Sequence, residues 1–168
     1  MAKPACVIAT AVWGDWHVDV YRTLNVPTML AEGNLPALTA QVDAVYTIHT
    51  TERDWNRLCA DEGFRRMAAL VDVRHSLLSD SDIGTPVETH HAVWRRAIAE
   101  ASRTGAYVIL MPPDIAWSDG SLRHLAKLMQ AGKKAIFLNW HVRSLEETFV
   151  SDFCRRYGGR DAISVPSR

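Results

Sequence analysis

Tyr107-Val108-Ile109-Leu110-Met111-Pro112-Pro113-Asp114 is the stretch of sequence that decides the fold. Its apolar part, which begins at Ala106 and runs to Met111, is typical of a β-strand buried on both faces of a sheet. The two prolines have no backbone N–H group to donate to a neighbouring strand, so the strand must end at Met111. Asp114 is therefore expected directly beyond the carboxyl end of a central strand.

Four further apolar runs predict the rest of the sheet. Residues 6–12 are almost continuously apolar and predict a second central strand. Residues 44–49 are rich in strand-forming residues. Residues 71–78 begin with alternating apolar and polar side chains, which indicates a half-exposed strand at the edge of the sheet. Residues 135–140 predict a fifth strand.

Helical patterns separate these runs, and the clearest covers residues 86–103. Thr85 and Glu88 have the spacing of a capping box at its start, and Gly105 suits its C-terminal end. Strands that alternate with helices predict an α/β fold with a three-layer, mostly parallel sheet. The simplest order is 3-2-1-4 plus a fifth strand. We expect one domain over residues 1–158 and a polar C-terminal tail over residues 159–168.

The composition excludes several classes of protein. The 168 residues include 19 Lys and Arg and 19 Asp and Glu, so the formal net charge is zero, which argues against nucleic-acid binding through a basic face. No apolar run reaches the roughly 18 residues of a transmembrane segment. The N-terminus lacks a signal-peptide pattern, and three scattered cysteines do not form a disulfide framework. These features predict a cytoplasmic protein.

The expected strand order places a site between the first and fourth strands. Open α/β sheets bind ligands beyond the carboxyl ends of the strands, where the chain reverses direction across the sheet. Asp114 is there as a hard oxygen donor for Mg²⁺ or Mn²⁺. The backbone N–H groups around Gly14 could bind an anion, and Trp13 offers a flat face to a base or sugar. Dinucleotide, P-loop, nucleophile-elbow and zinc motifs are absent.

Three segments resemble the nucleotide-sugar-binding half of a GT-A type glycosyltransferase. They are the first strand and its loop (7–13), the long helical segment 89–98, and residues 107–114 followed by 115–122. The resemblance covers roughly residues 5–142 and concerns the layout of the elements more than a strict motif. In this alignment the family's D-x-D motif falls on 112–114, so Pro112 replaces the first acid and Asp114 alone remains.

The resemblance implies a nucleotide-diphosphate sugar as donor, held with Mg²⁺ or Mn²⁺ at Asp114. The other expected donor-binding residues lie at the ends of the first two strands and on the long helix: Thr10, Ala11, Val12, Trp13, Gly14, His49, Thr50 and Arg95. Arg95 is included because a guanidinium group suits a diphosphate. The sequence identifies neither a catalytic base nor the acceptor, and it leaves the oligomeric state open.

Two alternatives use the same fold. The first is a non-catalytic nucleotide-binding or protein-interaction module, which the replaced first acid of the D-x-D position favours. The second is a flavodoxin-like domain, which would need phosphate-binding Ser or Thr residues after the first strand. The segment Trp13–Trp16 supplies none, so this alternative ranks last.

Overall fold

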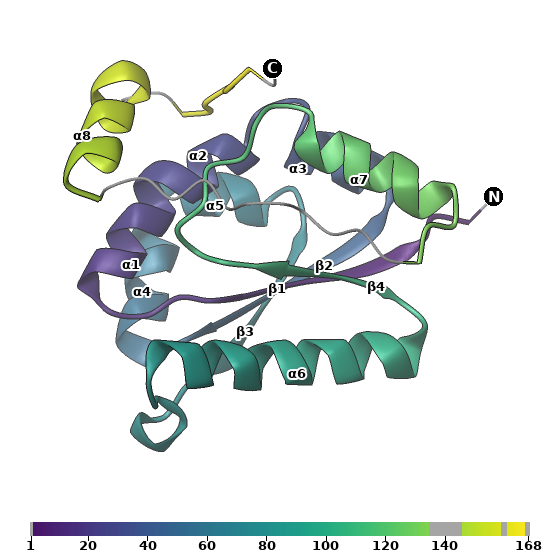
Figure 1. The fold of residues 1–168 in the computed structure, drawn as a ribbon, viewed down its shortest axis with the longest axis horizontal. Helices are drawn as coiled ribbons and strands as arrows, with labels where there is room; N and C mark the ends of the chain where they lie inside the picture. Colours follow the sequence, from purple (N-terminus) through teal and green to yellow (C-terminus); the bar gives the residue numbers. More distant parts are fainter. Residues whose placement is uncertain (1, 135–145, 159–160, 167–168) are drawn as a thin grey trace.

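A computed structural model, which describes residues 2–134, 146–158 and 161–166, contains a Rossmann-like sheet of four parallel strands in the order β3-β2-β1-β4 (Figure 1). The strands are β1 (Ala5–Ala11), β2 (Asp43–Thr50), β3 (Asp72–Leu77) and β4 (Tyr107–Met111). The predicted α/β class, the parallel sheet and the order 3-2-1-4 are confirmed. The expected fifth strand, residues 135–140, lies outside the described residues.

Helices cover the sheet on both faces. The helices are α1 (Asp15–Val20), α2 (Val26–Met29), α3 (Leu35–Gln41), α4 (Glu52–Ala60), α5 (Glu62–Ala68), α6 (Pro86–Thr104), α7 (Ser121–Gln130) and α8 (Glu146–Tyr157), with a π-helical segment (Tyr21–Asn25) and a 3₁₀ turn (Asp80–Asp82). In Figure 1, α6 lies along one face of the sheet, whereas α3, α5 and α7 lie on the other. No helix among the described residues is long and apolar enough to span a bilayer.

The register decides which side chains face which helices. Ile8 of β1 is level with Tyr46 of β2 and Ile109 of β4. Because side chains alternate along a strand, these three residues share the face opposite α6, which is covered by the larger group of helices, α2, α3, α5 and α7. The next residues, Ala9 and Thr47, face α6.

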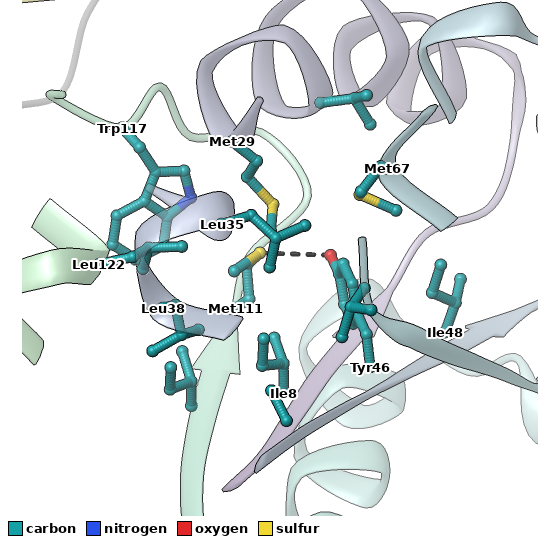
Figure 2. Close-up of a cluster of buried hydrophobic side chains, with 14 of the residues drawn as sticks. Ile8, Met29, Leu35, Leu38, Tyr46, Ile48, Met67, Met111, Trp117 and Leu122 are labelled. Atoms are coloured by element: carbon teal, nitrogen blue, oxygen red, sulfur yellow. Dashed lines mark hydrogen bonds between the residues drawn. The ribbon is translucent and has the colours of Figure 1, made fainter. Parts of the chain in front are cut away.

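The main core fills the space between the sheet and α2, α3, α5 and α7 (Figure 2). Buried tyrosine hydroxyls need a polar partner, and here two tyrosines satisfy one another. The Tyr21 hydroxyl donates to the Tyr46 hydroxyl over 2.9 Å, and the Tyr46 hydroxyl in turn donates to the Met111 sulfur over 3.2 Å. Burial raises the pKa of both phenols, so the pair stays protonated at neutral pH. This chain of polar atoms links the π-helical segment to β2 and β4.

The ends of α6 follow the sequence prediction. The Thr85 hydroxyl accepts from the Glu88 amide, and the Glu88 carboxylate accepts from the Thr85 amide over 3.0 Å. At the other end Gly105 has φ of 68°, a left-handed conformation that glycine adopts without steric cost. The predicted helix over 86–103 is therefore confirmed, with one more residue at its end.

The C-terminal residues 161–166 dock onto the body of the protein. Ile163 is 1% exposed, and its amide donates to the Pro27 carbonyl over 2.8 Å. The Asp119 amide donates to the Val165 carbonyl, while the Asp119 carboxylate accepts from the Gly33 amide and the Ser164 hydroxyl. Asp119 therefore ties three segments together.

Candidate functional site

The carboxyl ends of the four strands lie along one edge of the sheet, and the segments that follow β1 and β4 both pass to the face opposite α6, where they share one core cluster (Figure 1). The segment after β1 is tied to the start of α4, because the Gly14 amide donates to the Asp54 carboxylate over 2.8 Å. The segment after β4 is tied to the π-helical segment and α2, because Asn25 donates to the Pro112 carbonyl and the Trp117 amide donates to the Thr28 hydroxyl. β1 and β4 are neighbours in the sheet but not consecutive in the sequence, and open α/β sheets bind ligands beyond the carboxyl ends of such strands.

The first three expected donor-binding residues are fully buried. Thr10, Ala11 and Val12 are 0% exposed. Ala11 faces α6, whereas Thr10 and Val12 face the larger group of helices. The Val12 amide donates to the His49 carbonyl over 2.9 Å, which extends the β1–β2 pairing by one step. These residues fix the position of the loop that follows them.

Gly14 makes the turn that starts α1. Its φ of 78° and ψ of 155° belong to a region that other residues rarely adopt. Asp54, which is 3% exposed, accepts from the Gly14 amide and also from the Thr51 hydroxyl and Arg57. The buried carboxylate is thus fully engaged, and it holds the loop after β1 against the first turn of α4.

Asp15, the other carboxylate in this loop, is taken up by ion pairs. It pairs with Arg53 and Arg57 of α4, and Arg57 also reaches Asp19 over 3.2 Å. Because its charge is already matched by two arginines, Asp15 serves the α1–α4 contact.

His49 is the most unusual polar residue at this edge. It is 5% exposed, and its Nδ1 atom has no hydrogen-bond partner among the described residues. Burial, with a smaller contribution from the positive charge of Arg96, lowers the pKa of His49 to about 4. The imidazole is therefore neutral at physiological pH and retains an unused hydrogen-bonding atom.

Three further buried polar atoms without hydrogen-bond partners in the described chain lie near the same edge. They are Thr10 Oγ1, next to the last residue of β1, Thr50 Oγ1, at the last residue of β2, and Asn25 Oδ1, on the side chain that reaches the Pro112 carbonyl. Buried polar atoms are almost always hydrogen-bonded, so such atoms call for an explanation by a water molecule or a ligand. Thr50 and His49 are consecutive and face opposite sides of the sheet.

An aromatic cluster joins the loop after β1 to the first half of α6. The Trp13 ring lies 5.3 Å from the His90 ring and 6.1 Å from the His17 ring, between centroids, and is nearly parallel to His17. Trp94 lies edge-on to His90 at 6.0 Å. The His90 Nδ1 atom is 2.7 Å from the Pro86 carbonyl, which orients its ring. Trp13 remains partly exposed, so one flank of this cluster can be reached from solvent.

Asp114 is exposed beyond the double proline and makes no hydrogen bond or ion pair within the described part of the chain. In that same part, no three His, Cys, Asp or Glu side chains come close enough to bind a metal by themselves. Arg95 is exposed on α6, and the arginine whose charge acts on His49 is its neighbour Arg96. Arg96 also approaches Asp82 at 3.4 Å.

The sequence analysis missed Asp54 and the partners of Trp13. For Asp54 a signal existed, because Thr51 and Asp54 have the spacing of a helix cap. The contact of Trp13 with His90 depends on how α6 crosses β1, which no local pattern encodes. Comparison with known protein families, curated proteins and solved structures found no match for this chain.

Proposed function

We propose that this chain binds a nucleotide-diphosphate sugar at the carboxyl edge of its sheet, as the donor-binding domain of a GT-A type glycosyltransferase. The observation that carries the proposal is the strand order 3-2-1-4 with an exposed Asp114, which has no partner in the described part of the chain, just beyond the carboxyl end of β4. This is where a doubly wound sheet takes a ligand. The resemblance over 7–13, 89–98 and 107–122 supports the same assignment.

The described residues suit three parts of such a donor. Trp13 offers a partly exposed ring, backed by His90 and His17, on which a base or sugar ring can stack. His49 and Thr50 supply buried hydrogen-bonding atoms that lack partners in the described chain. Arg95 is exposed on the helix that carries His90, so its guanidinium group is available to a phosphate.

Mg²⁺ or Mn²⁺ fits this donor set only in combination with the donor itself. Magnesium sites in nucleotide enzymes commonly use one or two carboxylates and complete their shell with phosphate oxygens and water. Asp114 would be the protein ligand, on a segment stiffened by Pro112 and Pro113. Bound there, the ion would neutralise negative charge on the leaving diphosphate.

A second function, donor binding without transfer, is favoured by one specific observation. Pro112 stands where the family pattern has its first acid, so the chain brings a single carboxylate to the diphosphate. A non-catalytic nucleotide-binding or protein-interaction module would need no more. The acceptor of a catalytic member is unassigned.

Thermal unfolding with a panel of nucleotides tests the proposal. UDP, GDP and their sugar conjugates are each added with and without Mn²⁺. A ligand at one hundred times its Kd stabilises the fold by about 2.7 kcal/mol, which for a domain of this size is a shift in Tm of roughly 5–10 °C. The expected result is a Mn²⁺-dependent shift with one nucleotide class.

Matched variants locate the ligand. Asp114→Ala should abolish the dependence on Mn²⁺, and Trp13→Ala should reduce the shift with and without the metal. Asp43→Ala removes an exposed carboxylate at the opposite end of β2 and should change neither. The proposal fails if no nucleotide stabilises the protein, or if the shift survives both site substitutions. Release of nucleotide from the donor, measured on the native protein, then distinguishes transfer or hydrolysis from binding alone.

A further inference from the structure

The outer edge of β3 carries unpaired backbone groups. Among the described residues β3 pairs only with β2, and most of its side chains are exposed. The Leu78 amide, just past the strand, donates to the Thr50 carbonyl of β2 over 2.8 Å. Because successive residues of a strand point their N–H and C=O groups to opposite sides, Val73, His75 and Leu77 direct theirs outward. Such an edge is a template for another strand.

A hollow of about 390 Å³ lies beside the first half of this edge. Its apolar walls include Trp55 of α4, Phe64 of α5, and Val71 and Val73 at the start of β3. The Trp55 ring stacks on His75 at 4.5 Å between centroids, which holds the wall against the strand. The hollow therefore opens on the same face of the sheet as the side chains of Val73, His75 and Leu77.

The second half of the edge carries an apolar side chain that no element of the described chain covers. Leu77 is 50% exposed and lies four residues after Val73, on the same face of the strand. The edge thus has an apolar recess at one end and an apolar projection at the other, with His75 midway between them. If two copies were related by a two-fold axis through His75, Leu77 of each copy would lie against the hollow beside Val73 of the other.

We infer that β3 pairs antiparallel with β3 of a second copy of this chain, which would produce a continuous eight-stranded sheet. In this register His75 faces His75 of the second copy, and Leu77 of each copy lies opposite Val73 of the other, next to its hollow. The outward backbone groups of Val73, His75 and Leu77 then form the ladder. This arrangement buries the Leu77 side chain and also gives hydrogen-bond partners to the outward backbone N–H and C=O groups of β3.

The charges favour the same register. Arg74 would lie opposite Ser76 of the second copy, whereas a shift of two residues would place Arg74 opposite Arg74. Asp72 and Arg74 pair within their own strand at 2.9 Å, so the carboxylate that borders the hollow already has a matching charge.

Sedimentation velocity on the native chain, from about 1 to about 200 µM, measures this association, because interfaces of modest size often have Kd values in that range. We expect a monomer–dimer equilibrium, and Leu77→Arg should raise the Kd at least tenfold. Ile98→Arg changes an equally exposed apolar residue on α6 and should leave the Kd unchanged. Far-UV circular dichroism and Tm show whether each variant is folded.

Two further measurements test the register itself. In the dimer, hydrogen exchange at the His75 and Leu77 amides should be slow, and in Leu77→Arg it should be fast. Ser76→Arg, which would lie opposite Arg74 of the second copy, should weaken the dimer, and adding Arg74→Glu in the same chain should restore it. A native chain that stays monomeric throughout the range overturns the inference, as does a dimer that Leu77→Arg leaves intact or that Ile98→Arg weakens equally. Failure of nucleotide binding would not affect this result.

Discussion

The buried, neutral His49 makes the stability of the fold depend on pH in a defined direction. Burial lowers the pKa of His49 from 6.5 to about 4. The unfolded chain, in which the imidazole is hydrated, therefore binds more protons than the folded chain between these two values. Because protons favour the state that binds more of them, the contribution of His49 is present above pH 6.5 and is lost as the pH falls toward 4.

The size of the effect follows from the same two pKa values. One unit of pKa difference corresponds to about 1.4 kcal/mol, so the full contribution is at most about 3 kcal/mol. Between about pH 7.5 and about pH 5, where only part of the titration occurs, the free energy of unfolding should fall by about 2 kcal/mol from this residue alone. Carboxylates add their own pH dependence, and a variant is needed to separate the two.

Urea denaturation of the native chain and of His49→Gln, at both pH values, isolates the contribution. His49→Gln lowers stability at pH 7.5 because it disturbs a packed site, but its further loss at pH 5 should be about 2 kcal/mol smaller than that of the native chain. His124→Gln, which removes an exposed histidine of α7, should keep the native pH dependence. Equal pH dependence in the native chain and His49→Gln would refute the account of His49 as a buried neutral base.

Four further substitutions test what holds the fold around the site in place. Asp54→Asn removes the negative charge that accepts the loop amide and should cost about 2 kcal/mol in chemical denaturation, since hydrogen bonds to charged groups contribute roughly 1.5–3; an unchanged midpoint would contradict this. Tyr46→Phe should cost about 1–2 kcal/mol because it leaves the buried Tyr21 hydroxyl without its main partner, and a neutral result would show that the 3.9 Å contact of this hydroxyl with the Met67 sulfur suffices. Gly14→Ala should cost about 1 kcal/mol through backbone strain alone, because a Cβ there meets no atom within 4 Å. Gly33→Ala should cost clearly more, since its Cβ would come within 2.6 Å of the Gly120 amide and closer still to Asp119, and the order of the two Tm values decides the comparison.

The strands and their order were predictable because burial leaves a direct trace in the residue pattern. The continuous apolar runs at β1 and β4 require cover on both faces, and the alternation at the start of β3 requires one exposed side. The ends of α6 were predictable for a local reason, since Thr85, Glu88 and Gly105 act within a few residues of the helix ends.

Features that depend on distant residues were not predictable. Pro27 is a residue that usually interrupts a helix, yet the chain remains helical through Met29. The wider π-helical turn over Tyr21–Asn25 precedes the proline, and it belongs to the same helical run that places Tyr21 against Tyr46. The docking of Ile163 likewise depends on the Pro27 carbonyl and an apolar recess, neither of which is visible in a short polar segment.

At the candidate site, residue type pointed to the correct edge of the sheet but not to the surroundings of each side chain. His49 belongs to a strand whose residues alternate between faces, so only the position of α6 determines that its ring is buried near Arg96. Asp15 and Asp54 are both acids near helix starts. Asp15 forms ion pairs with Arg53 and Arg57, whereas Asp54 is buried and accepts from the Gly14 amide. This difference arises from the packing of α1 against α4.

The hydrogen bond from Gly14 to Asp54 has a consequence for how the loop after β1 meets any incoming molecule. The loop is held against the first turn of α4, which starts directly after β2. Its conformation is therefore already fixed in the unbound protein. A partner then loses little affinity to the ordering of the loop, and preorganisation of this kind is a general route to tighter binding. Weakening the fastening, as in Asp54→Asn, should therefore lower affinity at Trp13 even though Asp54 itself is buried beneath the loop.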